Sequence, residues 1–454
     1  MTGDPTPRRG LLRHRDFRLL WIGQTTSKLG SSVTGVALPL VAVATVGAST
    51  FQVAVLAAAA WVPWLLIGLP AGAWVDRLPR RPVMILADLA CLVLFLSVPV
   101  AAWLGVLGIG HLLAVALGAG TASVFFQTAY QVYLPTLLRP EQVAEGNAKL
   151  QGTESGAQVV GPGLAGLLAQ LVGAASALLA DAASFLVSAL CLWSIRTPEA
   201  RPAPDPHREN LRRQIHAGIR FVALDPYLRV LTVFGAASNI ALVGYQAILV
   251  VFLVREVGVS PGLVGALIAL TSLGGVLGAT AASWLARRFG TARGLLLSEL
   301  GAAPFGLLIP LTAPGPRLGF MVAGGVLVGA GIVAGNVIKG TFRQTYTPHH
   351  LLGRVTVSMQ LLNLGSIPFG ALLAGALGTG LGIRPTMWIM TACLPLSGLI
   401  LLVGPLRRRR DLPTRPPTHA RDGRASDVPG SDVAVPDVAG ADAPVPGELL
   451  AAGR

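Results

Sequence analysis

Twelve long apolar segments constrain this 454-residue chain more than any other feature of its sequence. An α-helix needs about 20 residues to cross a hydrocarbon core of ~30 Å. Only helices and closed barrels satisfy their backbone groups in lipid, and these continuous Ala, Leu, Val and Gly runs lack the alternation of barrel strands. We therefore predict an all-α membrane protein with transmembrane helices near residues 21–46, 52–75, 82–107, 111–135, 147–171, 175–195, 229–253, 262–286, 293–312, 318–341, 355–381 and 385–405.

Most of the charged residues, which make up only 12% of the chain, lie in the connections between these segments and at the ends of the chain. The net charge is +14, which by itself would suit nucleic acid. However, only Arg255, Arg317 and Arg384 fall in the connections on one side of the expected membrane. Because basic connections stay in the cytoplasm, this asymmetry predicts a multi-pass protein of the cell membrane with both termini cytoplasmic, and no nucleic-acid partner.

The two halves of the chain resemble each other. Residues 128–135 (TAYQVYLP) end the fourth segment and 341–348 (TFRQTYTP) end the tenth, with Thr, Gln, Tyr and Pro at one spacing. Related halves predict two pseudo-symmetric six-helix bundles with a binding site between them. The expected organisation is a cytoplasmic N-terminus 1–20, a first bundle 21–195, a linker 196–228, a second bundle 229–405 and a disordered cytoplasmic tail 406–454.

The linker and the tail carry patterns of their own. Residues 210–222 place apolar side chains at helical spacing with arginines on the other face, which predicts an amphipathic helix lying in the membrane interface. Residues 411–454 are rich in Pro, Asp, Ala, Gly and Val without periodicity, so we expect disorder there. The arginine block 407–410 is expected to bind anionic headgroups.

A charged turn, GAWVDRLPRR at residues 72–81, joins the second and third segments. Its pattern Gly-x-x-x-Asp-Arg-x-x-Arg-Arg resembles the signature loop of the major facilitator superfamily, with Pro79 where that family often has Gly. The alternative is a solvated topology loop, but topology does not require the Asp. The resemblance implies a gate that locks one bundle arrangement, formed by Gly72, Asp76, Arg77 and Arg81 with Asp88 as partner.

A second motif, Gly161-Pro162-Gly163-Leu164-Ala165-Gly166, lies within the fifth segment. It matches Gly-x-Gly-x-x-Gly, but a dinucleotide site needs a strand before it, so we reject that interpretation. The motif instead resembles the kinked fifth helix of facilitator exporters, in which Gly161 and Pro162 form the kink. Together with runs such as Asp181-Ala182-Ala183-Ser184-Phe185, residues 13–405 resemble the subgroup that contains enterobactin exporters and macrolide efflux proteins.

Charged residues inside the segments need a partner or a function, because each costs about 2.5–3.5 kcal/mol at a helix centre. Lys28 and Glu154 lie at similar depth, flanked on their helix faces by Gln24 and Gln158. We hypothesise that they pair in the empty transporter and that substrate or a proton competes for the pair; the alternative is a static ion pair. Asp88 and Glu299 are expected to be structural ion partners of nearby basic turns, and Asp181 to have a helix-end or packing role.

Further polar residues within the segments are cavity candidates, although such amides often only bond neighbouring helices. They are Gln127, Tyr130, Gln131, Asn239, Gln246, Asn336, Lys339 and Asn363.

The function predicted from these patterns is secondary active export of an amphipathic small molecule by a monomer working through alternating access. Proton exchange is the expected drive, because no Walker A sequence is present. No metal-ligand or nucleophile–base pattern occurs, so we expect neither a cofactor, nor a metal, nor an enzyme. The alternatives are proton-coupled nutrient uptake by the same fold and a non-transporting sensor or scaffold.

Overall fold

The computed structural model describes residues 11–75, 77–197 and 211–414, and within them twelve apolar helical spans are long enough to cross a membrane. The spans of the first half are formed by α1 (Arg15–Leu40), α2 (Thr50–Ala59), α3 (Val62–Val75), α4 (Arg80–Trp103), α5 (Ile109–Leu137), α6 (Pro140–Val172) and α7 (Ala174–Ser194). Those of the second half are formed by α9 (Pro226–Val251), α10 (Pro261–Phe289), α11 (Thr291–Ala302), α12 (Leu318–Tyr346), α13 (His349–Gly380), α14 (Ile383–Gly398) and α15 (Ile400–Val403). The predicted all-α fold with twelve spans is confirmed.

Prolines account for the changes of helix within the second and the ninth span. The second span breaks between α2 and α3 just before Pro63, since proline cannot donate the hydrogen bond that would continue α2. The ninth span starts as α11 and tightens into a 3-10 helix, Ala303–Leu311, which contains Pro304 and Pro310. The first span of each half ends in a π-helical turn, Val41–Thr45 after α1 and Phe252–Glu256 after α9. These matching ends agree with the related halves that the sequence indicates.

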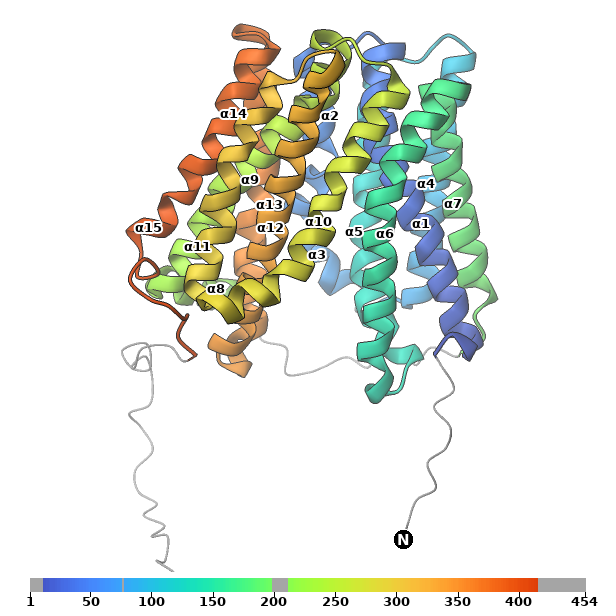
Figure 1. Cartoon of the computed structure of the whole chain (residues 1–454). Helices are drawn as coiled ribbons and strands as arrows, with labels where there is room; N and C mark the ends of the chain where they lie inside the picture. Colours follow the sequence, from blue (N-terminus) through green and yellow to red (C-terminus); the bar gives the residue numbers. More distant parts are fainter. Residues whose placement is uncertain (1–10, 76, 198–210, 415–454) are drawn as a thin grey trace, which may run out of the picture. The chain divides into compact units, whose positions relative to one another are not determined.

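The helices of the two halves lie on opposite sides of the molecule's membrane-spanning part (Figure 1). The chain alternates direction, so Leu11, Ile195, Asp225 and Leu406 share one end of the spans, here named the terminal face. The connections near Gly47, Gly105, Gly173, Gly258 and Gly382 form the opposite face.

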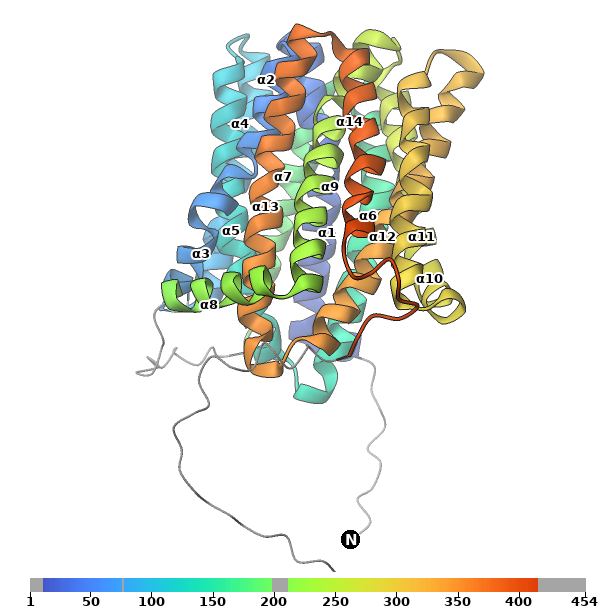
Figure 2. The ribbon, with the colours of Figure 1, turned by 90° about the vertical axis from the view of Figure 1, so that its left-hand side faces the viewer.

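The predicted amphipathic helix is present as α8 (Leu211–Leu224), which lies across the ends of the spans at the terminal face (Figure 2). It packs against α13, where an added Cβ on Gly218 would stand 2.5 Å from the Arg354 carbonyl oxygen. α9 follows at Pro226, three residues earlier than expected, because Asp225 caps it. The Asp225 Oδ1 accepts hydrogen bonds of 2.9 Å from the backbone of Tyr227 and Leu228.

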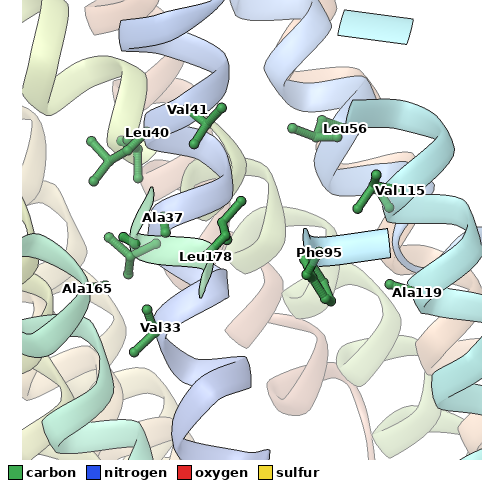
Figure 3. Close-up of a cluster of buried hydrophobic side chains, with 14 of the residues drawn as sticks. Val33, Ala37, Leu40, Val41, Leu56, Phe95, Val115, Ala119, Ala165 and Leu178 are labelled. Atoms are coloured by element: carbon green, nitrogen blue, oxygen red, sulfur yellow. The ribbon is translucent and has the colours of Figure 1, made fainter. Parts of the chain in front are cut away.

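Small apolar side chains fill the interior of the first half (Figure 3). Ala37, Leu40 and Val41 of the first span are fully buried and pack with Leu178 of α7. Many other large apolar residues face outward, for example Leu86 and Trp193, which are 69% and 72% exposed. Such exposure is typical of helices that face lipid rather than water.

The contacts between the halves that hold the opposite face together involve α6 with α10 and α2 with α13. Where α6 meets α10, Gly166 and Gly265 let the two backbones touch: a Cβ built on Gly265 would stand 2.3 Å from the Pro162 carbonyl oxygen. Between α2 and α13, a Cβ on Gly375 would stand 2.4 Å from Ala54 Cβ. Arg255 also donates across the halves to the carbonyl of Ala48 at 2.6 Å.

The start of the expected disordered tail is ordered in the structure. Residues 406–412 cross the connection between α10 and α11, and Leu406 is fully buried. The carbonyl of Arg410 accepts hydrogen bonds from the first turn of α11, and Asp411 Oδ1 accepts one from the Thr291 N–H at 2.9 Å. This segment therefore caps a helix whose N-terminal N–H groups would otherwise lack partners. Residues 415–454, the remainder of that expected tail, lie outside the described residues, as do residues 1–10 and 198–210.

Candidate functional site

Three cavities within the spans contain most of the predicted polar side chains. One, of about 420 Å³, lies among α1, α3, α4, α5 and α7 of the first half. A second, of about 430 Å³, lies between the halves. A third, of about 450 Å³, lies within the second half.

The first-half cavity is lined by Gln24, Lys28 and Gln127, as predicted for a polar site. It is also lined by Asp88 and Asp181, which the sequence analysis placed elsewhere. Asp181 is completely buried and accepts hydrogen bonds from the hydroxyls of Thr34 and Ser184. Asp181 therefore does not mark a helix end: it lies seven residues inside α7, where these two hydroxyls hold it, which leaves the packing role of the two that we expected.

The expected ion pair between Lys28 and Glu154 is present: Lys28 Nζ lies 3.1 Å from Glu154 Oε1. It joins α1 to α6, and both side chains are about one-third exposed. Two turns earlier in α1, Trp21 Nε1 donates to Thr153 Oγ1 at 3.0 Å, so the same two helices are joined twice. Glu154 touches the first-half cavity only through Lys28, and whether the pair exchanges partners during transport stays a prediction.

The charged turn between α3 and α4 is described on both sides of Asp76, which itself lies outside the described residues. Gly72 is half-buried at the end of α3, and Arg77 is exposed. Arg81 donates from Nε to the Leu192 carbonyl at 2.8 Å and from a terminal nitrogen to the Trp193 carbonyl. A cation at these last carbonyls of α7 is favourable because the negative end of the helix dipole lies there. The gate role of this turn, with Asp88 as partner, stays a prediction.

The cavity between the halves is lined by residues of α1, α6, α9, α10 and α12. Gln158 and Gln246 contribute amides from opposite halves, and Tyr245, Thr271 and Ser272 contribute hydroxyls. Its other lining residues are apolar, and none of the residues that line it is charged. This combination suits a molecule with apolar surface and a few neutral hydrogen-bonding groups.

The second-half cavity is lined by Asn239, Asn336, Lys339 and Asn363, all four of them predicted. Lys339 Nζ lies 2.7 Å from Glu299 Oε1 and 4.8 Å from the centre of the Phe234 ring. The structural partner of Glu299 is thus a lysine of α12; the basic turn beside α11 was the partner we expected. Asn239 and Asn363 are joined to each other, since the Asn239 amide donates to the Asn363 carbonyl at 3.2 Å.

Two other predicted residues have different surroundings. Gln131 is exposed near the terminal end of α5 and lines none of these three cavities. Gly161 packs against Ser32 of α1, and α6 continues through Pro162 as one helix. Close contact at Gly161 agrees with the motif, whereas the kink remains a prediction.

Sequence comparison places this geometry in a known family. The family described as transmembrane secretion effectors, of the major facilitator superfamily, matches residues 9–426. The chain belongs to this family. It is 28% identical over 413 residues to the multidrug efflux pump Tap of Mycolicibacterium fortuitum, covering 88% of this chain and 98% of that protein. It is 27% identical over 418 residues to the enterobactin exporter EntS of Escherichia coli O157:H7, covering 91% and 97%.

Solved structures with the same fold are also transporters. A bacterial homologue of the iron transporter ferroportin in an inward-facing state aligns with a TM-score of 0.71 at 17% identity, covering 88% of this chain and 100% of that one. The same homologue in an outward-facing state aligns with a TM-score of 0.54 at 19% identity, covering 87% and 100%. The chain is therefore a secondary transporter of the major facilitator type and a multi-pass membrane protein.

Several residues that shape the sites were missed by sequence reasoning. Asp225 caps α9 and also accepts a 2.6 Å hydrogen bond from the Tyr346 hydroxyl of α12. Its position directly before Pro226 is a helix-start signal that could have been used. Arg255, by contrast, looked like a topology charge, and nothing in the sequence indicates its hydrogen bond to Ala48.

Proposed function

We propose that this transporter exports an amphipathic small molecule, such as a drug or a secreted metabolite, across the cell membrane by alternating access. The observation that carries the proposal is the cavity between the halves, which is apolar with two amides and three hydroxyls and has no charged lining residue. A site of this chemistry binds apolar surface and gives orientation through a few neutral groups. The names of the two relatives, a multidrug efflux pump and an enterobactin exporter, support export.

The direction of opening follows from where the halves touch. The backbone contact between Gly166 and Gly265, and the close packing of Ala54 on Gly375, hold the opposite face closed. The better fit to the inward-facing relative supports the same state. With the basic connections on the terminal face, the positive-inside rule makes that face cytoplasmic. In this cycle the six-span halves rock as units, and the turn at Gly72–Arg81 releases when the terminal face closes.

Proton exchange is the proposed drive, and the Lys28–Glu154 pair is the proposed element that substrate or a proton breaks. Because the pair joins α1 to α6 and both helices also line the cavity between the halves, breaking it changes the walls of that cavity. Glu154→Gln keeps the side-chain shape and removes the charge. We expect this variant to reach the membrane at the wild-type level and to lose transport; transport at the wild-type rate would contradict the coupling role.

The test is drug and metabolite susceptibility in a bacterial strain that lacks its own efflux pumps. The compared chains are the wild type, Asp76→Asn, a Gln158→Leu/Gln246→Leu double variant, and Gln131→Leu as a matched amide control outside the cavities. Each lost hydrogen bond is worth about 0.5–1.5 kcal/mol. The growth of cells that express the double variant should therefore be inhibited at a compound concentration roughly tenfold lower than that of cells that express the wild type. Gln131→Leu should protect like the wild type.

The alternatives predict other outcomes. If no chain protects although all reach the membrane, export of the tested compounds is refuted. Growth defects on particular nutrients after deletion would then favour uptake. Protection that is equal in the double variant and the wild type would refute the assignment of the cavity while leaving export intact.

A further inference from the structure

Two carboxylates with almost no solvent exposure meet in the first half of the transporter. Asp88 of α4 is 1% exposed and Asp181 of α7 is 0% exposed. α7 packs against both α1 and α4, and both aspartates line the same first-half cavity. Because both side chains are almost fully buried and line one cavity, two acidic groups lie together inside the membrane-spanning part of the chain.

Neither aspartate has an ion-pair partner in the part of the chain that the structure describes. Among residues 11–75, 77–197 and 211–414, no ion pair within 4.0 Å involves either aspartate. Asp181 is held instead by the hydroxyls of Thr34 and Ser184. In the same described ranges, Gln24 Nε2 of α1 and Asp88 Oδ2 are buried without a well-formed hydrogen bond, and the polar group beside Asp88 is the Ser188 hydroxyl of α7.

The charges around the cavity do not balance two ionised aspartates. From α1 the facing charged group is Lys28, and it is already 3.1 Å from Glu154 of α6. From α4 the other titratable group is Cys91, a neutral thiol at ordinary pH, and α7 adds Cys191 near Ser188. The α5 side chains that line the cavity carry no titratable group. Two ionised aspartates would thus leave two uncompensated negative charges in a low-dielectric interior.

We propose that Asp88 and Asp181 form a proton-binding pair, and that this pair holds the coupling proton of the transporter, while the substrate acts on the Lys28–Glu154 pair of the same cavity. A protonated carboxyl removes the unpaired charge and gains an O–H donor, and the Ser188 hydroxyl beside Asp88 can accept the hydrogen bond from that donor. The binding chemistry is that of a proton, since the site offers two acids, hydroxyls and an amide without a fixed cation.

The pair is connected to the transport path through α1. Thr34 of α1 donates to Asp181, and the next turn of α1 presents Gly35, Val36 and Pro39 to the cavity between the halves. Loss of the proton from Asp181 changes the hydrogen bond between Thr34 and Asp181. It thereby changes the position of α1, which lines both the first-half cavity and the cavity between the halves. The coupling role rests on the proposed export function, whereas proton binding itself does not.

The test uses the purified full chain in lipid vesicles and needs no transport substrate. Infrared spectroscopy is used to follow the carboxylic-acid C=O band, which only protonated carboxyls give, across a pH titration. The variants are Asp88→Asn and Asp181→Asn, in which the amide imitates a neutral acid. The controls are Glu154→Gln and Glu299→Gln, since both of these carboxylates have a lysine partner within 3.1 Å.

We expect the wild type to keep an acid band at pH 7 that each aspartate variant reduces and each control leaves unchanged. The thermal midpoint of the wild type should fall as pH rises, because the folded state binds more protons than the unfolded state. Asp88→Asn and Asp181→Asn should fold and show a smaller pH slope.

Three results would overturn the proposal. The first is a wild type without an acid band at pH 7, and the second is an acid band that survives in both aspartate variants. The third is a thermal midpoint that rises when sodium or calcium is added and does not rise when the pH is lowered. The last result would assign the site to a metal cation. If the wild type protects cells but lacks the acid band, the export function stands and this inference fails. If the wild type shows the band but does not protect cells, proton binding stands and the export function fails.

Discussion

The contact between Gly166 of α6 and Gly265 of α10 allows a direct test of alternating access. The perturbation is Gly265→Ala, which adds one methyl group where the two backbones touch. That Cβ would stand 2.3 Å from the Pro162 carbonyl oxygen and 2.6 Å from the Gly166 Cα. Contacts of this kind do not occur below 3.0 Å, so the helices must separate by about 1 Å at the opposite face.

The magnitude follows from the cost of overpacking. Extra methyl groups in a packed contact cost about 1–3 kcal/mol. The gain in helix propensity from Gly to Ala is the same in both states of the transporter, so it cancels from the equilibrium between them. The cost acts only on the state in which the opposite face is closed. The equilibrium should therefore move toward the open opposite face by about 5- to 150-fold.

Spin-label distances measure this shift in a chain whose three native cysteines are replaced. One label pair at Leu104 and Leu381 spans the opposite face, and another at Leu78 and Leu224 spans the terminal face; all four side chains are exposed. We expect Gly265→Ala to widen the first pair and narrow the second. The matched control is Gly163→Ala, whose Cβ would stand 3.6 Å from the Ala269 Cβ and should move neither pair.

Rocking of two rigid halves requires both changes together. Widening of the Leu104–Leu381 pair without narrowing of the Leu78–Leu224 pair would refute it and indicate local separation of α6 from α10. An equal effect of Gly163→Ala would show that the shift does not come from the backbone contact.

Three further predictions concern stability, each measured as the free energy of unfolding or the thermal midpoint in detergent. Lys339→Met should cost about 3–5 kcal/mol because it leaves Glu299 buried and unpaired, whereas the double variant with Glu299→Gln should recover most of this loss; additive losses would contradict the pairing. Asp225→Ala should cost about 2 kcal/mol or more through the lost cap and the lost Tyr346 hydrogen bond, and Asp411→Ala, which removes one exposed cap contact, should cost less. Ending the chain after residue 405 should lower the midpoint relative to ending it after residue 414, since only the shorter chain lacks the cap on α11; equal midpoints would assign no stabilising role to residues 406–412.

The sequence by itself determines the spans, their relation as two halves and the partner of Lys28. Span length is set by the thickness of the bilayer, and backbone groups in lipid leave no alternative to helices. Lys28 and Glu154 could be paired because depth along a helix is readable from residue number and a buried charge needs an opposite one. The amphipathic α8 was predicted for the same kind of reason, since it lies outside the spans and its two faces differ in composition.

Only the tertiary structure decided which polar residues share a cavity. A helix in lipid is apolar on its outer face and in its packed interior, so periodicity does not reveal how it is rotated. For this reason Asp88 was assigned to a gate and Asp181 to a helix end or to packing, although α4 and α7 bring both residues to one cavity. Gln131 was expected in a cavity and is exposed instead, and residues 406–412 were expected to be disordered although they cap α11. Rotation and docking of this kind depend on the complementary surfaces of neighbouring helices, which come together only when the chain folds.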